Sequence, residues 1–423
     1  MFALLFQCIF SGCDVYVMAP LEMFESNQNL LFSGKFEYWL SQLQSANVKG
    51  IRIDVWWGLC EQEQKVYKFS GYKTVFNMAK NKGLKIIPIM SFHRCGGNAG
   101  DTCNIPIPEF VFQGSMKPYF VDLFGNKNSE YISCAYDNIE INGRTPLQMY
   151  HDFMTKFKEE FIDFINDGTI VEIDVGTGPC GELRYPSYQI DKWAYSGCGA
   201  YQSYDPLMKS KFKQAANLAG YTHYNSPPTD TGDYNVRPGG SSYWNDGWNS
   251  EYGKFFNKWY SNLLIEHGAN VLKDAREIFG SNIRISCKIS GVHWQYTTSC
   301  HCAELTAGYY NIWEYDGYQV MINMFKQYNI EVCFTCIEMN AQDYSAGSNP
   351  AALVVQVLKD TKNAGLQFSG ENSIERYDWN AYNQIKSWVP QGLSSFTYLR
   401  LCDELMDNNF VEFKKFVNAM NNA

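Results

Sequence analysis

The sequence predicts an α/β protein whose eight parallel strands close into a (β/α)8 TIM barrel. Eight short β-rich runs occur in order along the 423 residues. Several of these runs are continuously apolar, which is typical of parallel strands buried on both faces. Helical patterns separate the runs, and this alternation requires a parallel sheet. Long loops after strands 3, 4 and 5 are expected to form a small lobe over the active-site face.

The expected strands and helices cover the chain without an internal repeat or a Pro-rich linker. The strands are residues 15–18, 50–55, 84–91, 170–175, 283–289, 331–337, 367–370 and 395–401. The helices between them are residues 36–46, 149–165, 252–278, 318–328 and 351–364, and a last helix covers residues 409–420.

Two long excursions interrupt the alternation of strands and helices. Residues 93–148 follow the third strand, and residues 189–250 follow the fourth. The second excursion contains NSPPTDTGDYNVRPGGSSY, which is too rich in turn residues to form a long helix. Long loops in compact domains are often functional, and barrel enzymes build their sites where the strands end. We therefore expect these excursions to cover the mouth of the barrel.

The N-terminal residues 1–13, MFALLFQCIFSGC, are short and apolar, with small residues near the position of cleavage by signal peptidase. We expect a signal peptide, although no Lys or Arg lies near Met1. The alternative is an extension that covers the foot of the first strand. With residues 1–13 as the signal peptide, residues 14–423 are expected to form a single domain. The signal would place the protein outside the cell or in a vesicular or lysosomal lumen; without it, the cytoplasm is expected.

Composition and charge exclude several classes of partner. The net charge is -9, the sequence pI is about 5.3, and no basic tract is present, which argues against nucleic-acid binding. No apolar run reaches the length of a membrane span, so no membrane partner is expected. A neutral small molecule or polymer fits these properties better.

Common cofactor and metal motifs are absent or incomplete. The sequence GTGPCG at residues 176–181 matches GxGxxG, but Pro186 leaves room for only about one helical turn after it, so a dinucleotide site is rejected. No P-loop, HExxH or GxSxG motif occurs, and the six histidines are scattered. Neither a cofactor nor a metal is predicted.

The sequence contains 14 cysteines, whose pairing cannot be deduced from their spacing. Cys333 and Cys336 form a CxxC pair inside an apolar run, which we interpret as two buried thiols rather than a redox site. Cys95 and Cys103 bracket the sequence GGNAGDT. A disulfide between them and two free thiols are both compatible with the sequence, because the compartment is not known.

Polar residues follow most of the expected strands at the end where a barrel enzyme carries its site. They are Asp54, His93, Asp101, Glu182, Lys288, His293, Thr335, Glu338, Glu371, Asn372, Arg400 and Asp403. Any one of them could be a solvated or ion-paired loop residue. Their recurrence after successive strands favours a catalytic site.

Glu182 and Glu371 follow the fourth and seventh strands, roughly across the expected mouth. Glycoside hydrolysis requires two carboxyl groups, one protonated and one ionised, on either side of the scissile bond. Leu183 and Tyr185 predict an apolar setting for Glu182, which favours the protonated form of a carboxyl group. Lys288 would favour an ionised carboxylate at Glu371. A spacing of about 6.5–9.5 Å between the groups would mark an inverting enzyme, and about 5–5.5 Å a retaining one.

Eight ordered blocks of the sequence resemble the β-amylase family and span nearly the whole barrel. They are IDVWWGLCE, SFHRCGGNAGDTCNIPIP, GPCGELRYPSY, KISGVHW, HCAELTAGYY, FTCIEM, GENSIERYD and FTYLRLCDEL. The resemblance implies hydrolysis of α-1,4-glucosidic bonds from the non-reducing end, with release of β-maltose by inversion. It implies Glu182 as the general acid and Glu371 as the general base. A catalytically silent barrel that binds glucan or maltose is the alternative.

The resemblance also implies which residues contact the sugar. These are Asp54, His93, Asp101, Lys288, His293, Thr335, Asn372, Ser373 and Arg400. Residues 96–103 would form a mobile lid, and residues 334–339 an inner loop. The sequence departs from the family at Arg94, Gln295 and Asn340, which could alter sugar affinity. We expect a monomer with no appended starch-binding domain.

Overall fold

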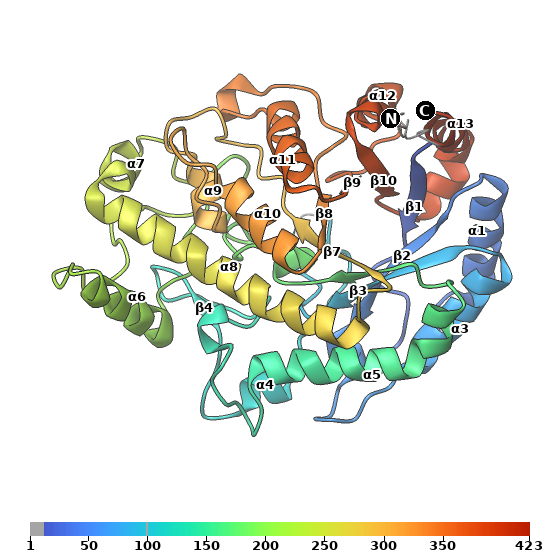
Figure 1. Ribbon diagram of the computed structural model, residues 1–423, viewed down its shortest axis with the longest axis horizontal. Coiled ribbons are helices and arrows are strands. Elements are labelled where there is room, and N and C mark those ends of the chain that lie inside the picture. Colours follow the sequence, from blue (N-terminus) through green and yellow to red (C-terminus); the bar gives the residue numbers. More distant parts are fainter. Residues whose placement is uncertain (1–11, 99) are drawn as a thin grey trace, which may run out of the picture.

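The computed structural model describes residues 12–98 and 100–423, and its centre is a closed barrel of eight parallel strands (Figure 1). The order around the barrel is β1-β10-β9-β8-β7-β6-β3-β2. The strands are β1 (Asp14–Met18), β2 (Gly50–Trp56), β3 (Lys85–Ser91), β6 (Glu172–Val175), β7 (Arg284–Ile289), β8 (Glu331–Phe334), β9 (Phe368–Glu371) and β10 (Leu393–Tyr398). The predicted TIM barrel is confirmed. The predicted signal peptide falls mainly on residues 1–11, which lie outside the described residues.

Helices surround the barrel and supply its outer layer (Figure 1). The longer ones are α1 (Ser33–Ser45), α3 (Ser70–Asn81), α5 (Pro146–Asn166), α8 (Glu251–Phe279), α10 (Gly317–Gln327), α11 (Pro350–Ala364), α12 (Trp379–Ser387) and α13 (Phe410–Asn421). Local sequence explains where they begin. Thr145 and Gln148 form a reciprocal capping box before α5, and the Ser250 side chain caps α8.

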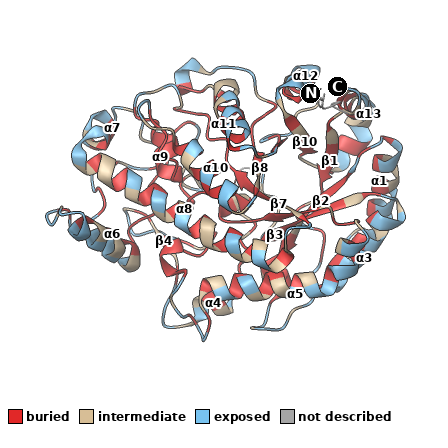
Figure 2. Ribbon diagram, viewed as in Figure 1, coloured by how far each residue is buried: buried red, intermediate tan, exposed pale blue. Residues whose placement is uncertain are grey.

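The strand β2 shows how the sequence separates the two faces of the barrel wall. Ile51, Ile53 and Val55 are almost fully buried in the hydrophobic core. Arg52 contacts side chains of strands that are not neighbours of β2, so it points into the barrel interior. Figure 2 shows the barrel strands largely buried, whereas the exposed residues lie on the outer faces of the helices and in the loops. The interior is therefore filled by side chains, and several of them are charged.

The two predicted excursions pack against each other. They contain α4 (Phe110–Gln113), the hairpin of β4 (Phe120–Val121) and β5 (Lys127–Asn128), α6 (Pro206–Leu218) and α7 (Ser242–Asn245). The amide of Tyr204 donates to the carbonyl of Val121, and Tyr234 donates to Asp122 Oδ2 at 2.9 Å. A disulfide joins Cys198 to Cys302 at the start of α9 (Cys302–Ala307), which follows the fifth strand. The three loops are thereby linked into one lobe.

Several predicted boundaries were wrong. The sixth strand ends at Phe334 rather than at residue 337, because the chain turns away from the sheet there and Cys336 adopts a left-handed φ of 60°. The eighth strand covers Leu393–Tyr398 rather than 395–401. The helices α3 and α12 were not predicted. Within the described residues, no helix is both long and apolar enough to cross a membrane.

Candidate active site

One cavity of about 510 Å³ opens at the carboxyl ends of the strands, and every residue predicted to be catalytic or to contact sugar lines it, whereas Glu338 and Asp403 do not. These residues are Asp54, His93, Asp101, Glu182, Lys288, His293, Thr335, Glu371, Asn372, Ser373 and Arg400. They come from loops that are widely separated in sequence. The parallel barrel brings them together because all its strands end on the same side.

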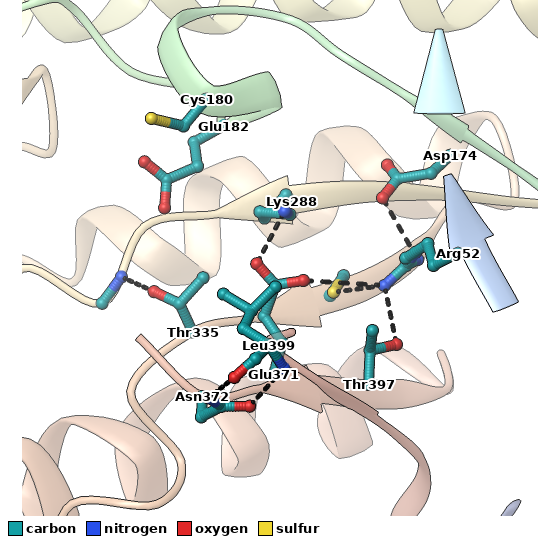
Figure 3. A network of polar contacts seen from close by, with 12 residues as sticks. Arg52, Asp174, Cys180, Glu182, Lys288, Thr335, Glu371, Asn372, Thr397 and Leu399 are labelled. Carbon is teal, nitrogen blue, oxygen red and sulfur yellow. Dashed lines mark hydrogen bonds and ion pairs between the residues drawn. The ribbon is translucent and has the colours of Figure 1, made fainter. Parts of the chain in front are cut away.

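Glu371 is the last residue of β9 and lines this cavity, and Figure 3 shows its carboxyl group among its polar neighbours. Its Oε1 is 2.6 Å from the Nζ of Lys288, and its side chain is only 3% exposed. Its Oε2 is buried, has no hydrogen-bond partner among the described residues, and lies 4.0 Å from Nη1 of Arg52. The predicted contact with Lys288 is confirmed. Two cations therefore face the two oxygens of this carboxyl group.

Glu182 follows β6 after a tight turn, Pro179–Gly181, in which Gly181 has a φ of 76°. The expectation of a purely apolar setting was wrong, because Arg184 Nε donates to Glu182 Oε2 at 2.6 Å. In an extended segment, residues two apart share a face. Leu183 and Tyr185 point the other way, and Tyr185 stacks on Tyr260 of α8. The alternation of polar and apolar residues in GELRY could have revealed this pairing.

Arg184 connects Glu182 to the lid, residues 96–98 and 100–103. Its guanidinium stacks over the ring of Tyr188 at 4.3 Å and donates to Asn98 Oδ1 at 3.1 Å. In the lid, Asp101 Oδ2 accepts hydrogen bonds from the amides of Gly96 and Asn98, each at 2.9 Å. The structure joins Cys95 and Cys103 in a disulfide at the base of this loop.

Two histidines in the cavity are held in the neutral form. Burial lowers the pKa of His93 to about 3, helped by the positive charges of Lys288 and Arg184. Burial lowers the pKa of His293 to about 4, against the opposing effect of Asp343. A neutral imidazole both donates and accepts a hydrogen bond, which suits contact with sugar hydroxyl groups.

The remaining predicted residues lie at the cavity wall and also support its loops. Thr335 Oγ1 accepts from the amide of Gly291 at 2.6 Å. Asn372 bonds both the amide and the carbonyl of Leu399, each at 2.8 Å. Further support comes from Ser91 bonded to Asp54, Ser373 bonded to Glu338, and Arg400 bonded to the carbonyl of Ala19. Of these bonds, those of Thr335 and Glu338 hold the inner loop, residues 334–339, against its neighbours.

Sequence reasoning missed the aromatic wall of the cavity. It consists of Tyr188, Trp193, Tyr195 and Trp294, whose rings contact one another. Aromatic residues are abundant throughout the chain, so composition could not distinguish these from core residues. Arg94, Gln295 and Asn340, where the sequence departs from the family, do not line the cavity. The predicted buried thiols of Cys333 and Cys336 are confirmed.

A closed barrel that brings two carboxyl groups into one cavity, from strands three steps apart, has the arrangement of a barrel glycosidase. Comparison with known proteins agrees with this class. The chain belongs to Glycosyl hydrolase family 14, whose model matches residues 16–423. The predicted family resemblance is thus confirmed.

Similar proteins extend over nearly the whole chain. A beta-amylase of Vigna unguiculata is 42% identical over 96% of this chain and 86% of its own length. Beta-amylase 2, chloroplastic, of Arabidopsis thaliana is 42% identical over 96% of this chain and 79% of its own length. Among solved structures, the catalytic domain of a beta-amylase from Paenibacillus polymyxa has a TM-score of 0.83 and 31% identity, covering 97% of this chain and 99% of that one.

Proposed function

We propose that the protein is an exo-acting hydrolase that cleaves α-1,4-glucosidic bonds from the non-reducing end and releases β-maltose with inversion. The observation that carries the proposal is the pair Glu182 and Glu371, which line one cavity in a chain of Glycosyl hydrolase family 14. The curated relatives described above are named beta-amylases, which supports starch-type glucan as the substrate.

In this proposal, Glu371 is the general base. Lys288 and Arg52 face its two oxygens and hold the carboxyl group in place, and this group accepts a proton from the attacking water. Glu182 is the general acid. Arg184 holds its Oε2 and leaves Oε1 without a protein partner among the described residues, so Oε1 is the oxygen that delivers the proton to the leaving sugar.

Sugar binding would use neutral hydrogen-bonding groups and aromatic faces. His93 and His293 are neutral, and Asp54, Thr335, Asn372, Ser373 and Arg400 add donors and acceptors around the cavity. The rings of Trp193 and Trp294 offer flat apolar surfaces for pyranose rings. Buried side chains such as Arg52 fill the barrel beneath Glu371 and close the floor. A closed floor favours entry of a chain end, as exo action requires.

Product analysis tests the proposal directly. Incubation with soluble starch should give maltose alone by chromatography, and proton NMR should detect the β-anomer before mutarotation. Mixed oligosaccharides would indicate endo cleavage, and an initial α-anomer would indicate a retaining enzyme, whose carboxyl groups stand closer together. Binding of glucan with no turnover would instead support the catalytically silent alternative.

We also propose that the protein functions in an oxidising compartment, as a secreted or luminal protein. Two disulfides, Cys95–Cys103 and Cys198–Cys302, support this location, because such bonds persist outside the reducing cytosol. N-terminal sequencing of the natural protein tests whether residues 1–13 are removed. The monomeric state remains a prediction that light scattering can check.

A further inference from the structure

A buried arginine lies directly beneath the carboxyl group of Glu371. Arg52 projects from β2 into the barrel, is 1% exposed, and places Nη1 4.0 Å from Glu371 Oε2 (Figure 3). Lys288, from β7, contacts the other oxygen, Oε1, at 2.6 Å. Two cations on different strands therefore face the two oxygens of one carboxyl group. Arg52 does not line the cavity, so it is out of reach of the sugar.

Arg52 is itself fixed by side chains from four other strands. Its Nη2 lies 3.1 Å from Glu172 Oε1 and 3.1 Å from Asp174 Oδ2, both on β6. The remaining partners are Ser286 on β7 at 3.0 Å from Nη2, and Cys333 on β8 and Thr397 on β10, at 3.1 and 3.4 Å from Nη1. A guanidinium held by so many partners has a fixed position, which a flexible ammonium would lack.

The charged groups nearest Glu371 lie inside the barrel, and one of the anions, Glu172, also pairs with Arg284 at 2.7 Å. Arg52 and Lys288 are the cations, Glu172 and Asp174 are the anions, and Cys333 contributes a thiol. Burial raises the pKa of Asp174 to about 6 and that of Cys333 to about 12, so this thiol is neutral. Burial alone would lower the pKa of Arg52, but Cys333 first, and then the carboxyl groups of Asp174, Glu172 and Glu371, raise it well above its ordinary value. Arg52 therefore stays charged and is shared between Glu371 and the β6 carboxylates.

We propose that Arg52 is a positioning residue for the hydrolysis of α-1,4-glucan, which holds Glu371 in place from below and keeps its carboxyl group ionised. The inference rests on the proposed assignment of Glu371 as the general base. Lys288 alone reaches only Oε1, whereas Arg52 faces Oε2, the oxygen that has no hydrogen-bond partner among the described residues. The charge of Arg52 thus acts on the base without contact with substrate.

The first test is Arg52→Met, with the pH profile of kcat/KM for a maltooligosaccharide as the readout. The substrate is uncharged, so the acidic limb reports ionisation of the base in the free enzyme. An opposite charge within about 4–6 Å lowers a carboxyl pKa by about 1–3 units, so its loss should move the acidic limb up by about one pH unit or more. KM should change less than kcat. Arg144→Met is the matched control, because Arg144 is also buried but pairs with Glu61, at 2.6 Å, outside the cavity. It should lower stability without moving the limb.

Two further variants keep the proposal testable even if Arg52→Met does not fold. Glu172→Gln removes an anion that competes for Arg52, so the acidic limb should move to lower pH, opposite to the effect of Arg52→Met. Arg52→Lys keeps the charge and should leave the limb closer to that of the wild type than Arg52→Met does. The proposal is overturned if Glu172→Gln leaves the limb unmoved or shifts it to higher pH.

Glu371→Gln separates this inference from the proposed function. Substantial turnover by Glu371→Gln would show that the assignment of the base, and with it the proposed function, is wrong. If Glu371→Gln is inactive but the acidic limbs of Arg52→Met and the wild type coincide, only the role of Arg52 is wrong.

Discussion

The two carboxyl groups proposed as the general acid and the general base are held by different parts of the molecule. Glu371 belongs to a barrel strand, and cations on two other strands, Lys288 and Arg52, face it. Glu182 lies beyond the end of its strand, and its cation, Arg184, belongs to the same loop. The base side is thus built from the barrel, whereas the acid side is built from loops.

Loops lack the hydrogen-bonded ladder that fixes a strand, and the acid side has other constraints in its place. Arg184 stacks on Tyr188 and bonds to Asn98 of the lid. Both disulfides, Cys95–Cys103 and Cys198–Cys302, lie in the loops on this side. The difference implies that distant substitutions should disturb the acid more readily than the base.

The largest effect, a fall in kcat, is expected when either carboxyl group is removed. Glu182→Gln and Glu371→Gln should each lower kcat on soluble starch by about 10²–10⁴-fold or more, because each removes a proton transfer. On α-maltosyl fluoride, whose leaving group needs little protonation, Glu182→Gln should recover much of its activity and Glu371→Gln should not. Glu304→Gln removes a buried carboxylate outside the cavity and serves as the control. Equal behaviour of the two variants on the fluoride would contradict the assigned roles.

The next largest effect is expected from substitution of Arg184, the cation that contacts Glu182. Arg184→Met should lower kcat by about 10- to 100-fold, because a displacement of about 1 Å in a catalytic group can cost that much. Arg184→Lys should rescue only part of the loss, since an ammonium cannot bond Glu182 and Asn98 with the same planar geometry. Steady-state kinetics on starch and on α-maltosyl fluoride measure both variants. A loss confined to KM would show that Arg184 binds sugar and does not position the acid.

A smaller effect is expected from the disulfides of the acid side. Cys198–Cys302 closes a separation of 104 residues and Cys95–Cys103 one of 8. The chain-entropy model gives a maximum of about 5 kcal/mol for the first and about 2.5 kcal/mol for the second. Replacing both cysteines of the longer bridge by serine should therefore lower Tm more, whereas the same change in the lid should mainly lower kcat by loosening it. Calorimetry and kinetics on the two double variants measure these effects. A larger fall in Tm after loss of Cys95–Cys103 than after loss of Cys198–Cys302 would contradict the prediction.

Much of the base side could be predicted from the sequence, because strands with long apolar runs and polar ends mark a barrel. Because Lys288 and Glu371 both lie at the polar ends of such strands, their contact could be expected. Arg52 could not be predicted as its neighbour. Its partners lie between 120 and 345 residues away, and only the register of the closed barrel brings them together.

On the acid side, the position of Glu182 in the cavity was predicted correctly, but the predicted apolar setting was wrong. Leu183 and Tyr185 adjoin it in sequence yet face α8, while Arg184 faces the same side as Glu182. The bridge between Cys198 and Cys302 was also out of reach, since disulfide pairing depends on the path of loops that carry no periodic signal.

The smallest effect concerns the pKa of His93, which is lowered by one cation from each side of the site, Lys288 and Arg184. Burial first, then Lys288, then Arg184 lower its pKa to about 3, against an ordinary value of 6.5. Below about pH 6.5 the unfolded chain therefore binds a proton at His93, whereas the folded protein does not. The contribution of neutral His93 to the free energy of unfolding is complete above that pH and is lost as the pH falls toward 3. His93→Gln cannot titrate, and its free energy of unfolding should fall less between about pH 7 and about pH 4.5, by up to about 2–3 kcal/mol. Urea unfolding at the two pH values measures this, with His151→Gln, a half-exposed histidine on α5, as the control. A His93→Gln slope equal to that of the wild type would show that the imidazole is not held neutral between the two cations.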